Sequence, residues 1–293
     1  MNSVFIDPRT KYPKPEFSSK PQPIPGSEKE MSPQADHGEN SYQGNNRLNG
    51  AVAIITGGDS GIGRAIAVAY AHEGAHVAFT YLEEDKDAQE TERLIKECGV
   101  EALSIRMDQT DRRACEAVID QCVSRFGRLD ILINNAAFQK VYDSIEEIPD
   151  EDIDYTFRTN IESFFFFSRY ALKFISPGGS IINTTSIQAF APSANLAPYA
   201  ATKAAIANFT LSLAEEAIKK GVRVNAVAPG PVWTPLIPST MPQERVKSFG
   251  SNTLFERPAQ PAELAPLYVF LASEDASYIT GEIFGVTGGR RQL

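Results

Sequence analysis

The sequence has few of the residues that metal centres, disulfide scaffolds and nucleic-acid surfaces require. Its three cysteines form no CxxC pair, which predicts free, buried thiols in a reducing compartment. Two of its three histidines, His72 and His76, are four residues apart, but the intervening Glu73-Gly74-Ala75 indicates a helix end, so no metal site is expected. A net charge of −9 without a Lys/Arg cluster argues against a nucleic-acid partner.

Long apolar runs are also absent. No run approaches the ~18 residues of a membrane helix, and Phe164 to Phe167 is far too short to span a bilayer. The N-terminus has no apolar segment of the signal-peptide kind. We therefore expect a cytoplasmic protein without a membrane partner. With 42% hydrophobic and 22% charged residues, the chain has the composition of an ordinary globule with a large core.

The first 47 residues differ from the rest. They hold seven prolines and show no sustained periodicity, which is typical of disordered or polyproline-like segments. The apolar residues Val4, Phe5, Ile6, Tyr12 and Phe17 favour an arm that docks on its own or a neighbouring subunit. A ligand for a proline-reading module is the alternative. The expected organisation is a Pro-rich arm, 1–47, and a folded domain, 48–293.

From Leu48 onward, predicted strands and helices alternate, which indicates an α/β fold with a doubly wound parallel sheet. Most strands are continuous apolar runs, as expected where both faces of a sheet are covered. The strands are expected at 51–56, 75–81, 101–107, 129–133, 179–185 and 222–228, and the helices at 61–73, 85–98, 111–126, 150–175, 198–220 and 261–273.

A glycine-rich turn joins the first strand to the first helix. Its pattern is Gly57-x3-Gly61-x-Gly63, with Ser60 and Ile62 between the glycines. Glycines permit a tight turn and a close approach to a pyrophosphate, whose charge meets the helix N-terminus. A lone glycine cluster is more often an ordinary turn. The flanking strand and helix favour a nucleotide site.

A second motif follows an apolar strand and opens an Ala-rich helix. Tyr199 and Lys203 are four residues apart and share a helix face, so the ammonium can lie beside the phenol. A cation lowers a phenol pKa, and moving it from ~10 to ~7 takes about 4 kcal/mol. Ser186, thirteen residues before Tyr199, offers a hydroxyl for a substrate oxygen. Such a Tyr/Lys pair alone often lies on a solvated helix face without any function. The predicted nucleotide site nearby favours a catalytic role for this one.

Together with Asp108, Asn134 to Ala137, Asn160 and Pro229-Gly230, these motifs resemble the short-chain dehydrogenase/reductase family from about Leu48 to Gly289. The likeness is closest to the subgroup labelled glucose/ribitol dehydrogenase homologues, which carries a similar arm. The resemblance implies a seventh strand at 282–287, and so a single Rossmann-type sheet of about seven strands. It also implies hydride transfer between a nicotinamide cofactor and a small alcohol or carbonyl substrate, possibly a polyol or sugar.

The resemblance implies four catalytic residues. Tyr199 transfers a proton as general acid/base, and Ser186 holds the substrate oxygen. Lys203 lowers the pKa of Tyr199 and holds the cofactor ribose. Asn160 bends its helix and holds a water that links Lys203 to solvent.

The resemblance also implies the cofactor contacts. Asp108 would bind the adenine amino group, although a helix cap is the alternative that Asp111 suits better. Ala137 replaces the family's usual glycine and makes the local packing uncertain. The expected cofactor site comprises Gly57, Ser60, Gly61, Ile62, Gly63, Tyr81, Leu82, Asp108, Gln109, Asn134, Ala136, Tyr199, Lys203, Pro229, Gly230, Val232 and Thr234.

The choice between NAD and NADP depends on the turn after the second strand, Tyr81-Leu82-Glu83-Glu84. A carboxylate there favours NAD and a cation favours NADP. The two glutamates and Ser60, where many NADP-using members carry Arg, give a slight lean to NAD. Arg64 is the candidate partner of a 2′-phosphate.

The segment Pro235 to Gly250 is expected to form much of a substrate lid. Ser186, Gln188 and Trp233 are the predicted substrate contacts, with further apolar walls from Leu236, Ile237 and Phe249 and polar contacts from Gln139 and Asn195.

Three other functions stay open. A nucleotide-binding sensor or scaffold would keep the site with weak catalysis. An epimerase or dehydratase also uses the Tyr/Lys pair, but with a different glycine spacing. A binding module would act through its Pro-rich arm. Four consecutive aromatics, Phe164 to Phe167, exceed what one helix face can bury, and we expect a homotetramer.

Overall fold

The computed structural model describes residues 5–18 and 20–290. Seven parallel strands form one sheet in the order β3-β2-β1-β4-β5-β6-β7, so the predicted doubly wound fold and its seventh strand are confirmed. The strands are β1 (Val52–Ile55), β2 (His76–Tyr81), β3 (Ala102–Arg106), β4 (Leu129–Asn134), β5 (Ile175–Thr184), β6 (Arg223–Pro229) and β7 (Ile283–Val286).

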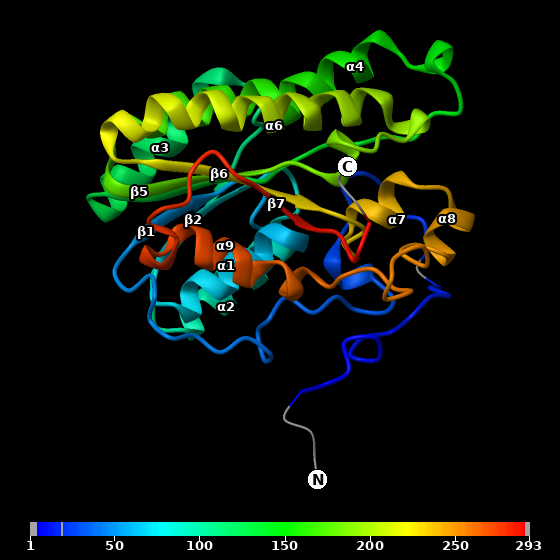
Figure 1. Ribbon diagram of the computed structural model, residues 1–293. Coiled ribbons are helices and arrows are strands. Elements are labelled where there is room, and N and C mark those ends of the chain that lie inside the picture. The colour runs from blue at the N-terminus through cyan, green and yellow to red at the C-terminus, as the bar shows by residue number, and fades with distance from the viewer. Residues whose placement is uncertain (1–4, 19, 291–293) are drawn as a thin grey trace.

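Helices cover both faces of the sheet (Figure 1). One face carries α1 (Gly61–His72), α2 (Asp85–Glu97) and α9 (Ala265–Ala272). The other carries α3 (Arg112–Phe126), α4 (Asp150–Phe157), α5 (Ser163–Ala171) and α6 (Ala197–Ala217). The short helices α7 (Leu236–Thr240) and α8 (Gln243–Lys247) lie together at one end of the molecule.

The central strand explains where a ligand can bind. Every residue of β1 is buried, because helices pack on both of its faces. Its two neighbours, β2 and β4, are followed by helices on opposite sides of the sheet, so the connections diverge at this point. In open α/β sheets such a divergence leaves a crevice at the carboxyl ends of the strands.

The predicted helix 150–175 is wrong in two respects. It is interrupted by a π-helical turn at Arg158–Glu162, and α5 ends at Ala171. Strand β5 begins at Ile175, ahead of its predicted start at residue 179, because Ile175 pairs with Leu129 before a register shift. The pairing is non-local, and helical periodicity gives no sign of it.

The Phe run is divided between core and surface. Phe164 and Phe167 are buried in the core between α5, α3 and the sheet. Phe165 is 50% exposed and packs against Phe209 of α6, with ring centroids 4.0 Å apart. The run is therefore half core, and the exposed part is narrower than the sequence suggested.

The described part of the arm lies along its own domain (Figure 1). Phe17 is buried against Trp233, with ring centroids 4.4 Å apart, and the indole Nε1 donates to the Pro33 carbonyl at 2.8 Å. These residues form an apolar cluster with Met31, Ala35, Ile237 and Val246. Docking on the same subunit is the form of docking that the structure shows.

Two of the proposed apolar anchors have exposed side chains. Phe5 and Ile6 are exposed, and Val4 lies outside the described residues. Tyr12 is part-buried and donates a hydrogen bond to Asp36 at 2.6 Å.

Membrane helices and metal clusters are two features that the sequence did not lead us to expect. No helix in residues 5–18 and 20–290 is long and apolar enough to cross a membrane. Those residues also contain no cluster of three or more His, Cys, Asp or Glu able to hold a metal. Cys115 and Cys122 are free and buried, and burial raises the pKa of each thiol to about 12, which makes them poor nucleophiles.

Candidate active site

A cavity of about 530 Å³ opens at the carboxyl ends of the strands. It brings together most of the predicted site: Gly57, Ser60, Gly61, Ile62, Tyr81, Leu82, Asp108, Gln109, Ala136, Ser186, Gln188, Tyr199, Lys203, Pro229, Gly230, Val232 and Thr234 all line it. Four predicted residues do not line it: Gly63, Asn134, Asn160 and Trp233. One continuous cavity therefore joins the glycine turn to the Ser/Tyr/Lys group.

The glycine turn is held against the end of β4. Gly57 has φ +63°, and a Cβ there would lie 3.0 Å from the Cβ of Ala136. The Thr56 hydroxyl accepts hydrogen bonds from the backbone of Asn135 at 2.8 Å and of Ala136 at 3.0 Å. Only glycine tolerates both this conformation and this close approach, so the turn packs directly on the end of β4.

Gly63 does not line the cavity but lies where α1 packs against the glycine turn. A Cβ there would lie 1.9 Å from the Gly57 carbonyl oxygen, so the glycine lets α1 pack directly on the turn. This placement corrects the expectation of a direct cofactor contact.

Asn134 is also displaced from its expected role. It is fully buried, and its Nδ2 donates to Asn183 Oδ1 at 2.9 Å and to Ser168 Oγ at 3.1 Å. The next residue, Asn135, lines the cavity instead and donates to the Thr56 carbonyl at 3.1 Å. Along a strand, adjacent side chains face opposite sides, which separates their roles.

The end of the cavity where the adenosine is expected is acidic. Asp59 and Glu84 both line it. Burial, with help from the charge of Glu84, raises the pKa of Asp59 to about 7, and burial also raises the pKa of Glu84. Asp108 lines the same end, while Asp111 caps α3 by accepting from Arg113 N at 2.8 Å, as expected.

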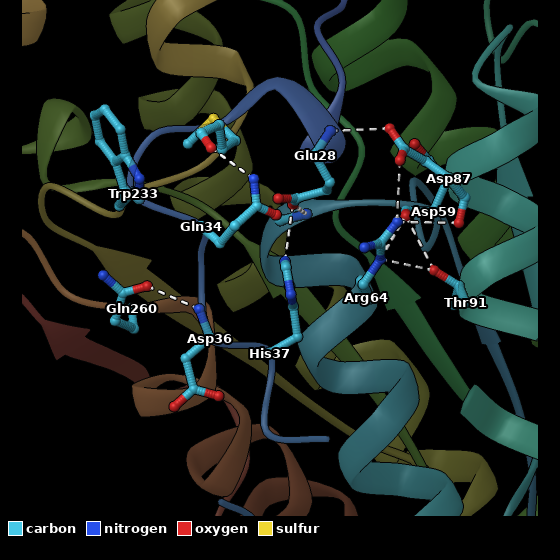
Figure 2. Close-up of polar contacts among 12 residues, drawn as sticks. Glu28, Gln34, Asp36, His37, Asp59, Arg64, Asp87, Thr91, Trp233 and Gln260 are labelled. Carbon is cyan, nitrogen blue, oxygen red and sulfur yellow. Dashed lines mark hydrogen bonds and ion pairs between the residues drawn. The ribbon is translucent and has the colours of Figure 1, made fainter. Parts of the chain in front are cut away.

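Arg64 is not free to meet a phosphate. It is buried, and its guanidinium donates to the Asp59 carbonyl and the Thr91 hydroxyl, both at 2.9 Å, and to the Asp87 carbonyl at 3.0 Å (Figure 2). The idea of Arg64 as partner of a 2′-phosphate is therefore wrong. The guanidinium instead ties α1 to α2 below the cavity.

The Ser/Tyr/Lys group lies where β5 meets α6. Lys203 is 1% exposed, and its Nζ donates to the Thr184 carbonyl at 2.9 Å. The same Nζ lies 5.3 Å from the centre of the Tyr199 ring, as the shared helix face predicts. The Ser186 hydroxyl faces the cavity and accepts from the Gln188 amide at 3.1 Å.

Burial sets the protonation of this group. It raises the pKa of Tyr199 to about 12, against a smaller lowering by the Ser186 hydroxyl. It lowers the pKa of Lys203 to about 7. The expected fall of the phenol pKa towards neutrality is absent in the cofactor-free chain, because burial disfavours both the phenolate and the ammonium.

Asn160 lies in the π-helical turn, behind the cavity. Its Oδ1 accepts from Phe138 N at 2.7 Å, and its Nδ2 donates to the Phe138 carbonyl at 2.8 Å and to Thr202 Oγ1 at 3.1 Å. Thr202 directly precedes Lys203, so Asn160 fixes α6 against the loop after β4. The bend predicted at Asn160 coincides with this π-helical turn, whereas the water relay stays a prediction.

The Pro229–Thr234 segment closes the end of the cavity where the nicotinamide is expected. A Cβ on Gly230 would lie 2.8 Å from Thr287 Cα, so the chain passes tightly across the end of β7. Thr234 packs on the glycine turn, since its Cγ2 would lie 3.0 Å from a Cβ on Gly61. The two cofactor motifs therefore meet across the cavity.

The substrate end differs from its prediction at one residue. Leu236, Ile237 and Phe249 line the cavity as expected, as do Asn195 and Gln139. Trp233 does not, because its ring is buried beneath the arm. Gln188 lines the cavity, but its side-chain amide is engaged with Ser193. Its Oε1 accepts from Ser193 N at 2.7 Å, and its Nε2 donates to Ser193 Oγ at 3.0 Å.

Sequence reasoning missed several lining residues. Ile24, Pro25 and Gly26 of the arm line the cavity, as do Arg245 of α8 and Arg290. The only sequence signal was the Pro25-Gly26 pair, which marks a turn and does not say what the turn packs against.

Comparisons with known proteins agree with this geometry. Residues 57–291 match a family model described as enoyl-(acyl carrier protein) reductase. The chain is 49% identical over 272 residues to NADPH-dependent aldehyde reductase 1, chloroplastic, from Arabidopsis thaliana, covering 90% of this chain and 94% of that protein. It is 48% identical over 271 residues to glucose and ribitol dehydrogenase from Daucus carota, covering 90% and 93%.

The fold is also similar to that of a solved short chain dehydrogenase. The crystal structure of a short chain dehydrogenase from Burkholderia cenocepacia, in complex with NADP, superposes with a TM-score of 0.79 at 32% identity. The match covers 83% of this chain and 98% of that one.

Proposed function

This chain belongs to the short-chain dehydrogenase/reductase family of oxidoreductases, and we propose that it moves a hydride between a nicotinamide dinucleotide and an alcohol or carbonyl substrate. The observation that carries the proposal is that the glycine turn and the Ser186–Tyr199–Lys203 group line one cavity. A dinucleotide would fit because Gly57, Ser60 and Gly61 line the cavity at the N-terminus of α1, where a pyrophosphate can be bound. When bound, its nicotinamide supplies or accepts the hydride.

In the proposed mechanism, each of the four residues has its own role. Ser186 donates to the substrate oxygen and orients it, and Tyr199 gives or takes the proton of that oxygen. Lys203 would supply a cation beside the phenol in its protonated form, which is about half populated at pH 7, and would contact the ribose of a bound cofactor. Asn160 holds α6 in place through Thr202, so that the tyrosine and lysine keep their positions.

The substrate class is proposed from the cavity wall. Polar contacts from Ser186 and Asn195 suit a hydroxylated substrate such as a polyol or sugar, while Leu236 and Phe249 provide apolar contact. The test is a panel of polyols, sugars, aldehydes, ketones and secondary alcohols with NAD(H) and NADP(H). No turnover with any member would leave the nucleotide-binding sensor as the better explanation.

We propose a nicotinamide dinucleotide as the cofactor and state no preference between NAD and NADP. The lean to NAD finds no support in the comparisons, since the Burkholderia structure holds NADP and the Arabidopsis relative is named as NADPH-dependent. Glu84 nevertheless places negative charge in the cavity, and Asp59, with a pKa of about 7, adds to it in its ionised form, which disfavours an additional 2′-phosphate.

We expect Glu84→Gln to raise the NADP:NAD ratio of kcat/KM by about fivefold, because removing one nearby charge is worth about 1 kcal/mol at such a part-exposed site. Steady-state kinetics with both cofactors measure the ratio. Glu83→Gln is the matched control, since Glu83 is exposed and does not line the cavity. An equal rise in both variants would contradict a local effect of Glu84.

We expect alcohol oxidation to accelerate as pH rises from 7 to 10. Oxidation needs Tyr199 as phenolate, and burial raises its pKa to about 12. Lys203, whose pKa burial lowers to about 7, is mostly neutral above pH 7, so the reactive form is the phenolate itself, which grows about tenfold per pH unit below pH 12. Carbonyl reduction needs the phenol, which persists over the same range. Initial rates in both directions test this. An oxidation rate that is flat or falls with pH would contradict it.

We propose that the protein is a cytoplasmic homotetramer. Each of its chains consists of an arm, 1–47, and a domain, 48–293. The exposed aromatic ring of Phe165 and the exposed side chain of Leu211 lie on the neighbouring helices α5 and α6, a surface suited to pairing with a second copy. Light scattering at micromolar concentration should give four chain masses. Phe165→Glu should lower that mass, whereas Ile145→Glu, also at an exposed apolar residue, should not.

A further inference from the structure

The arm forms part of the cavity wall. Ile24–Gly26 lies between the glycine turn and the lid. The Pro25 carbonyl accepts from Ser239 Oγ of α7 at 3.1 Å. Gly26 has φ +95°, and a Cβ there would lie 2.7 Å from the Pro235 carbonyl oxygen, so its backbone packs directly on the lid. A short stretch of arm thus contacts the segment expected to form much of the substrate lid.

Two residues further on, the arm reaches the glycine turn. Glu28 is 3% exposed, and its Oε1 accepts from the Gly61 backbone amide at 2.6 Å and hydrogen-bonds His37 Nε2 at 2.8 Å (Figure 2). Its own backbone amide donates to Asp87 Oδ2 at 3.0 Å. Burial opposes the charge of Glu28, but His37 and the other partners outweigh it and lower its pKa. The side chain is therefore a carboxylate.

This carboxylate is a costly way to stabilise a fold. Its Oε2 is buried without a hydrogen-bond partner in the part of the chain that the structure describes. Buried charges rarely stabilise more than apolar residues of the same size. Two side-chain contacts distinguish Glu28 from such a residue, its hydrogen bond to His37 within the arm and its hydrogen bond to Gly61, and only the second reaches the glycine turn.

Glu28 approaches the turn from behind. It does not line the cavity, whereas Gly61 and its neighbour Ile62 do. The carboxylate therefore uses the amide of Gly61 and leaves the cavity side of the α1 N-terminus open to a phosphate. Gly61 has φ +50°, and a turn with this much glycine loses much conformational freedom when it becomes ordered.

We propose that Glu28 is a positioning residue for dinucleotide binding, which holds the glycine turn through the Gly61 amide while Ile24–Gly26 completes the wall between the turn and the lid. An acceptor fixed in place by the docked arm orders the turn before the ligand arrives. Ordering the site in advance raises affinity by lowering the entropy lost on binding. The inference rests on the proposed function, since it requires that a dinucleotide occupies the cavity.

The test compares two variants of similar size. Glu28→Met removes the acceptor, whereas Glu28→Gln keeps an oxygen that can accept from Gly61. The dissociation constants of NADH and NADPH, measured by fluorescence titration, should rise about tenfold in Glu28→Met and stay within about threefold in Glu28→Gln. At saturating cofactor, kcat should stay within about threefold in both, because the Ser186–Tyr199–Lys203 group is untouched.

A core variant separates positioning from general destabilisation. Val118→Ala lies in α3, in the core on the opposite face of the sheet from α1, and should lower the melting temperature without changing either dissociation constant. Should Glu28→Met fail to fold, the double variant Glu28→Met/His37→Phe replaces both partners by apolar groups, and the same tenfold loss is expected of it.

The outcomes are distinct. A folded Glu28→Met that binds both nucleotides as the wild type does would overturn the proposal. Tighter binding by both Glu28 variants would overturn it too, since the carboxylate would then compete with the phosphate. A wild-type protein that binds neither NADH nor NADPH would instead refute the proposed function on which the inference depends.

Discussion

Tyr199→Phe should lower kcat by about a thousandfold or more while the dissociation constant of NADH or NADPH stays within about twofold. The variant loses only the phenolic oxygen, and Phe fills the same space beside Lys203. Without that oxygen, no group at this position can give or take the substrate proton. Single-turnover kinetics and fluorescence titration measure the two quantities separately.

Tyr155→Phe is the matched control for this prediction. It removes a phenolic oxygen from the same cavity but from α4, and should leave kcat within about threefold. A Tyr199→Phe variant with near-normal turnover would show that the proton moves through another group, and the proposed mechanism would fail.

Lys203→Met should lower kcat/KM by about a hundredfold to a thousandfold and weaken cofactor binding by about tenfold. It removes both the cation beside Tyr199 and the predicted contact with the cofactor ribose. The fold should not suffer. Burial lowers the pKa of Lys203 to about 7, from 10.5, so the unfolded chain binds this proton more tightly and the lysine costs stability at neutral pH.

The melting temperature of Lys203→Met at pH 7 should therefore rise by a few degrees, and calorimetry measures it. Lys220→Ala is the control, because its ammonium contacts the Leu172 carbonyl and does not line the cavity. An unchanged cofactor dissociation constant in Lys203→Met would count against the ribose contact, whatever the rate.

The sequence predicted those parts of the site that local pattern specifies. Strand β1 and the turn at Gly57 adjoin each other in the chain, so residue spacing was enough to place a phosphate cradle. Tyr199 and Lys203 share one turn of one helix, and periodicity placed their side chains together. Each of these features depends on residues a few positions apart.

Features that depend on distant contacts could not be predicted in this way. Trp233 has an apolar ring that suits a substrate wall equally well, and only the position of Phe17 shows that it is buried under the arm. Asn134 and Asn135 are adjacent and chemically identical, so the orientation of the strand end decides which one faces the cavity. Glu28 carries no local signal, because its partner Gly61 is 33 residues away.

The order of synthesis gives the docked arm a further consequence. Pro33 meets the Trp233 indole across 200 residues of sequence, so an arm made first must wait for a partner made much later. At about 5–20 residues per second, that wait is on the order of 10–40 s. Throughout it, Phe17 and Met31 remain uncovered. The prolines around them hinder pairing with other strands, which protects the nascent chain from aggregation until its binding surface is complete.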